Sequence, residues 1–164
     1  MDLVLDPPRG VKPVLLGMTL DEAVAAVSPW GAPEVLTRRT RRSVKVSASC
    51  DGVGFQALLE DGEQVTAIEL WWPGEGKETS TRVLLNGDDV FRTPAEDILR
   101  RAAERGWRVD DSQPENPVIP RVSLGFTRQT SQEVPRGSDG LPVCFTSVLV
   151  GGEDYYDYRY ENRG

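Results

Sequence analysis

The fold is decided by residues 55–72, which read FQALLEDGEQVTAIELWW. Apolar and polar residues alternate before and after the Asp-Gly pair at positions 61 and 62, which is the pattern of strands that bury one face. An Asp-Gly pair between two such runs indicates a tight hairpin turn. We therefore expect two antiparallel strands, the second of which turns Trp72 toward the core and Trp71, with Glu69, to the opposite face.

Further strands are expected on both sides of this hairpin. Alternation predicts them around 44–48, 122–126 and 143–150, and weaker patterns occur at 3–5, 82–85 and 107–109. Together these segments predict a mainly antiparallel sheet of about six to eight strands.

The first predicted helix begins at the capping box Thr19-Leu20-Asp21-Glu22. In this motif the Thr side chain accepts a hydrogen bond from the Glu amide, while the Glu side chain reaches back. Pro29 ends the helix after an apolar face with helical spacing, formed by Leu20, Ala23, Val24 and Val27.

The second predicted helix spans 94–105 and starts with the same motif, Thr93-Pro94-Ala95-Glu96. Gly106 is placed to end it in a left-handed conformation. The expected buried stripe is Ile98, Leu99, Ala102 and Ala103, and the expected exposed ion pairs are Glu96 with Arg100 and Asp97 with Arg101. With both helices packed on one face of the sheet, the chain is predicted to be an α+β protein.

A length of 164 residues favours a single domain over 1–164. The two helix-start motifs raise the hypothesis of a degenerate repeat, with halves at about 10–85 and 86–160. Only the capping box and one apolar position agree between the halves, so a shared rule for starting helices explains the similarity almost as well.

Composition excludes several kinds of chemistry. The chain has 26 acidic and 19 basic residues, a net charge of −7 and no histidine. The acidic balance argues against nucleic-acid binding through phosphates. The missing histidine excludes Ser-His-Asp catalysis and His-ligated zinc from this chain alone. Phosphate-binding and nucleophile motifs are also missing from the sequence, so we expect no enzyme, no cofactor and no metal.

The two cysteines, Cys50 and Cys144, lie far apart without a CxxC spacing, which favours reduced thiols. The N-terminus lacks the pattern of a secretory signal, and no apolar run approaches the roughly 18 residues that span a bilayer. We therefore expect a cytoplasmic protein without membrane association.

The stretch 10–24, GVKPVLLGMTLDEAV, resembles the entry motif of several small α+β families, in which a short strand leads through Gly-Met-Thr into a capped helix. It is similar to the start of the repeats in the beta-lactamase inhibitory protein family and in outer-membrane assembly lipoproteins. The resemblance implies helices on an antiparallel sheet whose exposed face binds another protein. The paired cysteines of the inhibitory repeats and the lipidated N-terminus of the lipoproteins are missing here, so no functional residue is carried over. The opening and the ending GGEDYY at 151–156 also resemble small α+β proteins of actinobacteria, which implies no activity.

The candidate partner-binding residues are Trp71, Glu69, Tyr155, Tyr156 and Tyr158. A tryptophan beside a carboxylate, on a sheet face away from the helices, suits an interface because Trp and Tyr contribute much of the binding energy at interfaces. The alternatives are that both tryptophans cap the ends of a core, and that the Tyr-rich tail is a fraying terminal strand.

A basic block, Arg38, Arg39, Arg41 and Arg42, precedes a predicted strand. It has the charge to bind a phosphate or an acidic partner, but a solvated loop or sheet edge is the interpretation we favour.

Two functional hypotheses remain. The first is a cytoplasmic protein-interaction module, of immunity or inhibitor type, that binds a basic protein partner such as a nuclease toxin. The second is a small-molecule-binding domain or a carboxylate-only enzyme, with its pocket between helix and sheet.

Overall fold

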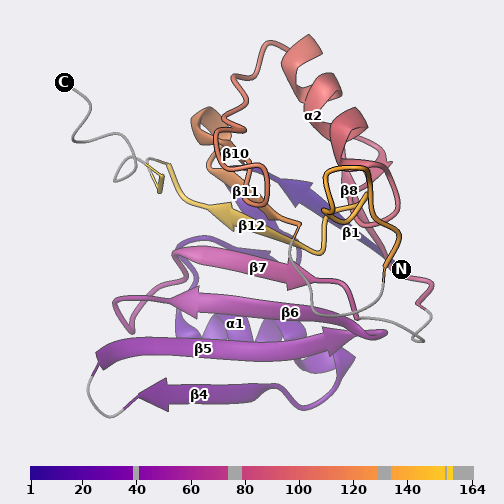
Figure 1. Cartoon of the computed structure of the whole chain (residues 1–164). Coiled ribbons are helices and arrows are strands. Elements are labelled where there is room, and N and C mark those ends of the chain that lie inside the picture. The colour runs from indigo at the N-terminus through magenta and orange to yellow at the C-terminus, as the bar shows by residue number, and fades with distance from the viewer. Residues whose placement is uncertain (39–40, 74–78, 129–133, 154, 157–164) are drawn as a thin grey trace, which may run out of the picture.

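The computed structural model describes residues 1–38, 41–73, 79–128, 134–153, 155 and 156 of the chain. These residues form two sheets, two α-helices and two short 3-10 helices (Figure 1). The expected α+β architecture is confirmed, with the difference that the strands divide into two sheets.

The larger sheet has seven strands, and all its neighbouring strands are antiparallel. Their spatial order is β10 (Val118–Ile119), β11 (Leu124–Thr127), β12 (Ser147–Gly151), β7 (Ala67–Trp71), β6 (Val53–Leu59), β5 (Arg41–Cys50) and β4 (Glu34–Arg38).

The smaller sheet has five strands, of which β1 and β8 pair in parallel while the others pair antiparallel. Their order is β3 (Val14–Leu15), β2 (Gly10–Val11), β1 (Asp2–Asp6), β8 (Arg82–Leu85) and β9 (Asp88–Asp89).

The predicted hairpin is formed by β6 and β7, which pair from Gly54 opposite Trp71 to Leu58 opposite Ala67. In the turn, Gly62 has a φ of +80°. The Asp61 carboxylate accepts hydrogen bonds from the amides of the two residues that follow Gly62, at 2.8 and 3.0 Å. The Asp-Gly pair therefore closes the turn as the sequence predicts.

Helix α1 (Leu20–Val27) begins at its predicted capping box. Thr19 Oγ1 accepts from the Glu22 amide at 3.3 Å, and Glu22 Oε1 accepts from the Thr19 amide at 3.3 Å. Ala23 and Val27 are fully buried, which confirms the predicted apolar face.

Helix α2 (Ala95–Glu104) lacks the predicted capping box. Pro94 is the N-cap residue, and no side chain caps the helix. The Ala95 amide donates instead to the Val143 carbonyl at 2.8 Å, because the segment before β12 runs beside the helix start. A backbone contact between distant segments therefore takes the place of the cap expected from Thr93.

The faces of α2 follow the prediction in part. Ile98 and Ala102 are buried and Leu99 is partly buried, but Ala103 is exposed. The ion pairs also differ from those expected, because Arg100 pairs with Asp97 at 3.1 Å and Arg101 pairs with Asp88 of β9 at 2.6 Å. The second of these pairs connects α2 to the smaller sheet. Gly106, with a φ of +88°, follows the helix as predicted.

Three strand predictions differ from the structure. The predicted strand 143–150 begins only at Ser147, because the segment before it bridges to the start of α2 instead. Residues 107–109 form no strand, and the nearby Asp110 makes only an isolated bridge to Val118. Val122 lies in a 3-10 helix (Pro120–Val122), after which Ser123 adopts a φ of +52° and β11 begins. The edge strand β4 was not predicted, because its residues show no one-sided apolar alternation.

One face of the larger sheet packs on the core and the other is open over β4 to β7. Helix α1 lies behind β5 and β6 in Figure 1, and the covered face contributes Val46, Phe55, Leu70 and Val148 to the core. No helix in the described part of the chain covers the opposite face of these strands (Figure 1). We call that opposite face, continued over β10 to β12, the outer face.

The two helices enter the fold through similar backbone contacts. Thr19, before α1, bridges to Gln64, and Pro94, before α2, bridges to Cys144. Gln64 and Cys144 precede β7 and β12 by the same number of residues, and those two strands pair with each other. These contacts favour the degenerate-repeat hypothesis, which stays a prediction.

Candidate functional site

Residues on the outer face form rows that cross the strands. The row through Glu69 contains Glu34, Ser47, Gln56, Glu69, Leu149, Gly125 and Val118. Directly opposed residues in neighbouring strands turn their side chains to the same face. Glu69 therefore lies at the centre of the outer face, between Gln56 and Leu149.

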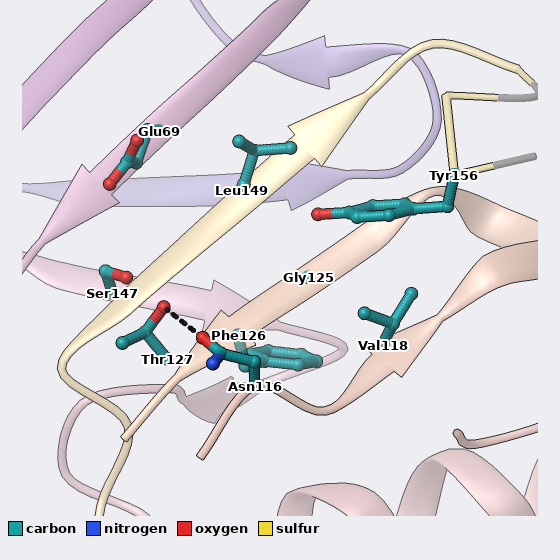
Figure 2. Close-up of a pocket in the computed structure, with 9 residues that line it drawn as sticks. All are labelled: Glu69, Asn116, Val118, Gly125, Phe126, Thr127, Ser147, Leu149 and Tyr156. Atoms are coloured by element: carbon teal, nitrogen blue, oxygen red, sulfur yellow. Dashed lines mark hydrogen bonds between the residues drawn. The ribbon is translucent and has the colours of Figure 1, made fainter. Parts of the chain in front are cut away.

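A cavity of about 150 Å³ lies on this face beside Glu69 (Figure 2). Strands β7, β10, β11 and β12 supply most of its lining, and the segments before β10 and after β12 complete it. The lining residues are Glu69, Asn116, Val118, Gly125, Phe126, Thr127, Ser147, Leu149 and Tyr156.

Glu69 contributes a half-buried carboxylate to the cavity. Burial raises the pKa of its carboxyl group above the usual range, and the charge of Lys45 offsets only part of this effect. Within the part of the chain that the structure describes, the Glu69 carboxylate makes no hydrogen bond or ion pair. The cavity therefore contains an acidic group that is partly desolvated and lacks a close cation.

Polar side chains form another part of the lining. Thr127 Oγ1 donates to Asn116 Oδ1 over 3.4 Å, and Ser147 is the register partner of Thr127 on β12 (Figure 2). The segment that carries Asn116 is fixed to β11 on both sides, because the Arg128 amide donates to Glu115 and the Phe126 amide donates to Pro117, at 2.8 and 3.0 Å. Backbone pairing between β11 and the segment around Asn116 therefore holds the Asn116 and Thr127 oxygens in place.

Tyr156 closes the remaining side of the cavity and is 7% exposed. Its phenol oxygen lies against the backbone of Gly125, where a Cβ atom would overlap it. Figure 2 shows the phenol group pointing inward from the β11 side, while Glu69 approaches from β7. The absence of a side chain at Gly125 therefore makes room for this ring.

Tyr155 lies beside Tyr156 in an edge-to-face arrangement, with ring centroids 5.3 Å apart. Its hydroxyl donates to Glu60 Oε1 at 2.7 Å, and its side chain lies against Gly151. Tyr155 thus fixes the segment that carries Tyr156 but does not line the cavity.

Trp71 lies on the outer face with Glu69, as the alternation predicts. Its ring does not project into solvent, because it lies over Gly54 of β6 and is half-buried. Trp72 lies on the inner side and packs against Phe91, with ring centroids 6.0 Å apart. Trp71 is next to the cavity rather than in its lining.

The structure thus brings two of the five predicted site residues, Glu69 and Tyr156, into one cavity. Tyr158 lies outside the described residues. The sequence analysis missed Asn116, Thr127 and Ser147, which join the site through strand pairing between distant segments. Alternation along β12 was the available signal for Ser147 and Leu149, but it does not identify the partner strand.

The basic block lies at the edge of the larger sheet. Arg38 ends the edge strand β4, Arg41 begins β5, and Arg42 is exposed. Arg39 lies outside the described residues. These positions agree with the edge interpretation of the block.

A second cavity, of about 310 Å³, lies where β7, the segment before α2 and the segment before β12 meet. Its lining is mainly apolar and includes Trp72, Phe91, Phe145 and Cys144. Arg92 lies 4.9 Å from the Trp72 ring and pairs with Asp89 at 2.7 Å. Burial raises the pKa of the Cys144 thiol, so the thiol stays protonated near neutral pH and is a weak nucleophile.

The residues described contain no group of three or more His, Cys, Asp or Glu side chains placed to hold a metal ion. Cys50 and Cys144 are free thiols. No helix among the described residues has the length and apolar character that crossing a membrane requires.

Comparisons with protein-family models, curated proteins and solved structures found no match to this chain. Its function therefore has to be argued from the geometry of the fold and its cavities.

Proposed function

We propose that this chain is a protein-interaction module that binds a basic protein through the outer face of its larger sheet. The observation that carries this proposal is the half-buried Glu69 carboxylate, which has no cation at bonding distance among the described residues. Burying a charge without a partner is unfavourable, whereas a charged group from a bound protein would compensate it.

The overall charge supports the same partner chemistry. A net charge of −7 attracts a basic protein over a distance comparable with the Debye length and accelerates the encounter. Trp71 and Tyr156 add aromatic contact area on the same face, and aromatic residues are enriched at the centres of interfaces. An immunity or inhibitor protein that neutralises a basic toxin is the specific form of this function that we favour.

Affinity capture at two salt concentrations tests the proposal. The full chain should retain a basic protein from a lysate of the source organism at low salt and release most of it at about 0.5 M salt, where charges are screened over a few ångströms. Glu69→Gln and Trp71→Ala should each reduce capture of that protein. Glu96→Gln makes the same charge change on the exposed side of α2 and should not. Capture that is equal for all these variants would contradict the proposal.

The apolar cavity near Cys144 favours a second candidate function, the binding of a small apolar molecule. Its volume of about 310 Å³ is at the lower end of the range of ligand pockets, which is roughly 300–1,000 Å³. A bound apolar molecule should slow the alkylation of Cys144 and raise the melting temperature. A gene neighbourhood of metabolic enzymes would favour this candidate, and a neighbouring toxin gene would favour the first.

A further inference from the structure

We propose that the Glu69 cavity is a pocket for one arginine side chain of the protein partner. This inference rests on the proposed function, since it identifies the group that the partner inserts at the centre of the outer face. It follows from the volume of the cavity, its hydrogen-bonding groups and its charge.

The volume of the cavity suits a side chain better than a metabolite. At about 150 Å³ it holds the equivalent of about five water molecules, each occupying roughly 30 Å³. Pockets for cofactors and drug-sized ligands are usually larger, at roughly 300–1,000 Å³. A guanidinium group with its adjoining methylenes has a size comparable with that of the cavity.

The lining offers several hydrogen-bond acceptors. Glu69 on β7 supplies its carboxylate, and Thr127, Ser147 and Asn116, which lie close together, supply hydroxyl and carbonyl oxygens. A guanidinium presents five N–H donors in a fixed planar arrangement, whereas an ammonium presents three around one point. A carboxylate facing a group of further acceptors therefore favours arginine over lysine.

The aromatic and electrostatic environment agrees with this assignment. Tyr156 contributes its phenol group to the lining, and this amphipathic group can contact both the methylenes and the N–H groups of an inserted arginine. Arginine stays charged when it is desolvated, while the pKa of a buried lysine falls. An inserted guanidinium would therefore pair with Glu69 without losing its charge.

The test uses the full chain and two matched probes, N-acetyl-arginine methylamide and N-acetyl-lysine methylamide, followed by amide NMR spectra. We expect the arginine probe to shift the amide signals of Gly125, Ser147 and Leu149 with a dissociation constant on the order of 1–10 mM, as is usual for a fragment. The lysine probe should bind at least about fivefold more weakly. Glu69→Gln should weaken the arginine probe about tenfold or more, because it removes the charge-assisted bond, while Glu96→Gln should leave it unchanged.

Several outcomes would overturn the inference. Equal binding of both probes would show a general attraction for cations, and binding that survives Glu69→Gln would place the probe elsewhere. Failure of both probes to shift these signals would contradict the proposed arginine pocket. Salt-sensitive capture of the partner would in that case still support docking on the outer face. The dispersion of the Glu69→Gln spectrum reports whether that variant is folded, so loss of binding is not confused with loss of structure.

Discussion

At the scale of single residues, Glu69 is expected to lower the stability of the free protein and to strengthen the binding of a partner. Its carboxylate is half-buried and unpaired among the described residues, so its ionised form is less favourable in the folded chain than in the unfolded one. A half-buried charge without a partner is unfavourable for the free protein, but it can form an ion pair when a bound partner supplies a cation. Groups that perform a function often have this property.

We predict that Glu69→Gln stabilises the free protein at pH 7. After allowance for solvent screening of a half-exposed group, the gain should be about 0.5 kcal/mol, or about 1–2 °C in melting temperature. The pKa of Glu69 is raised on folding, so the folded chain takes up the proton first and its stability rises as pH falls through the raised pKa. The advantage of the variant should therefore shrink toward pH 4 in thermal unfolding measured over pH 4–7. A variant that is less stable at pH 7 would show that the carboxylate has a partner.

Gly125 provides a second prediction at this scale. Its backbone φ lies outside the left-handed region, so an alanine is unfavourable there only because its Cβ would overlap the Tyr156 phenol oxygen. We expect Gly125→Ala to displace Tyr156 and to cost about 1–3 kcal/mol, the usual range for overpacking.

A double-mutant cycle checks this cause. If the overlap is responsible, Gly125→Ala should cost much less when Tyr156 is already alanine, which denaturant unfolding of the four proteins would measure. Additive effects of the two substitutions would place the cost elsewhere in β11.

At the scale of elements, the two helix starts show what a local motif can and cannot predict. The motif at Thr19 forms its capping box, whereas at Thr93 the neighbouring chain at Val143 supplies the hydrogen-bond acceptor. The turn at Asp61-Gly62 was predictable for the same reason as the first cap, since its partners lie within a few residues. The unpredicted features, such as the parallel pairing of β1 with β8, join residues about 80 positions apart or more.

The two threonines give a matched prediction. Thr19→Ala should cost about 1 kcal/mol because it removes a side-chain cap, while Thr93→Ala should change stability by less than about 0.5 kcal/mol. Chemical denaturation of both variants measures the difference. Equal losses would mean that Thr93 stabilises α2 through a contact other than a cap.

For the candidate site, too, the sequence predicts local relations between residues but not contacts between distant segments. Alternation along β7 places Glu69 and Trp71 on one face, because that relation depends only on neighbours in the chain. The position of Tyr156 over Gly125 and the pairing of β12 with β7 depend on the whole fold. Sequence reasoning therefore predicted the face but not the cavity.

At the scale of the whole molecule, the two proposed halves share the larger sheet, where strand β7 of the first half pairs with β12 of the second. In the smaller sheet, β1 at the start of the chain pairs with the distant β8. Buried side chains from both halves form one hydrophobic cluster, which includes Phe55 from the first half and Phe145 from the second. The cavity on the outer face also depends on the pairing of β7 with β12, because Glu69 lies on β7 and Tyr156 follows β12.

This union predicts one cooperative unfolding transition for the whole chain. Trp30, Trp71 and Trp72 lie in the first half and Trp107 in the second, so in a Trp107→Phe variant tryptophan fluorescence reports on the first half and, through Trp72, on its contact with Phe91. Its unfolding midpoint should coincide with that of the far-ultraviolet circular dichroism of the same variant, which reports on both halves. A fragment of residues 1–73 should not fold by itself, because β7 and β1 each lose one of their two partner strands and the buried Ile68 and Leu70 lose part of their cover. Two separate midpoints, or a fragment with a folded spectrum, would show that each half is a domain able to fold alone.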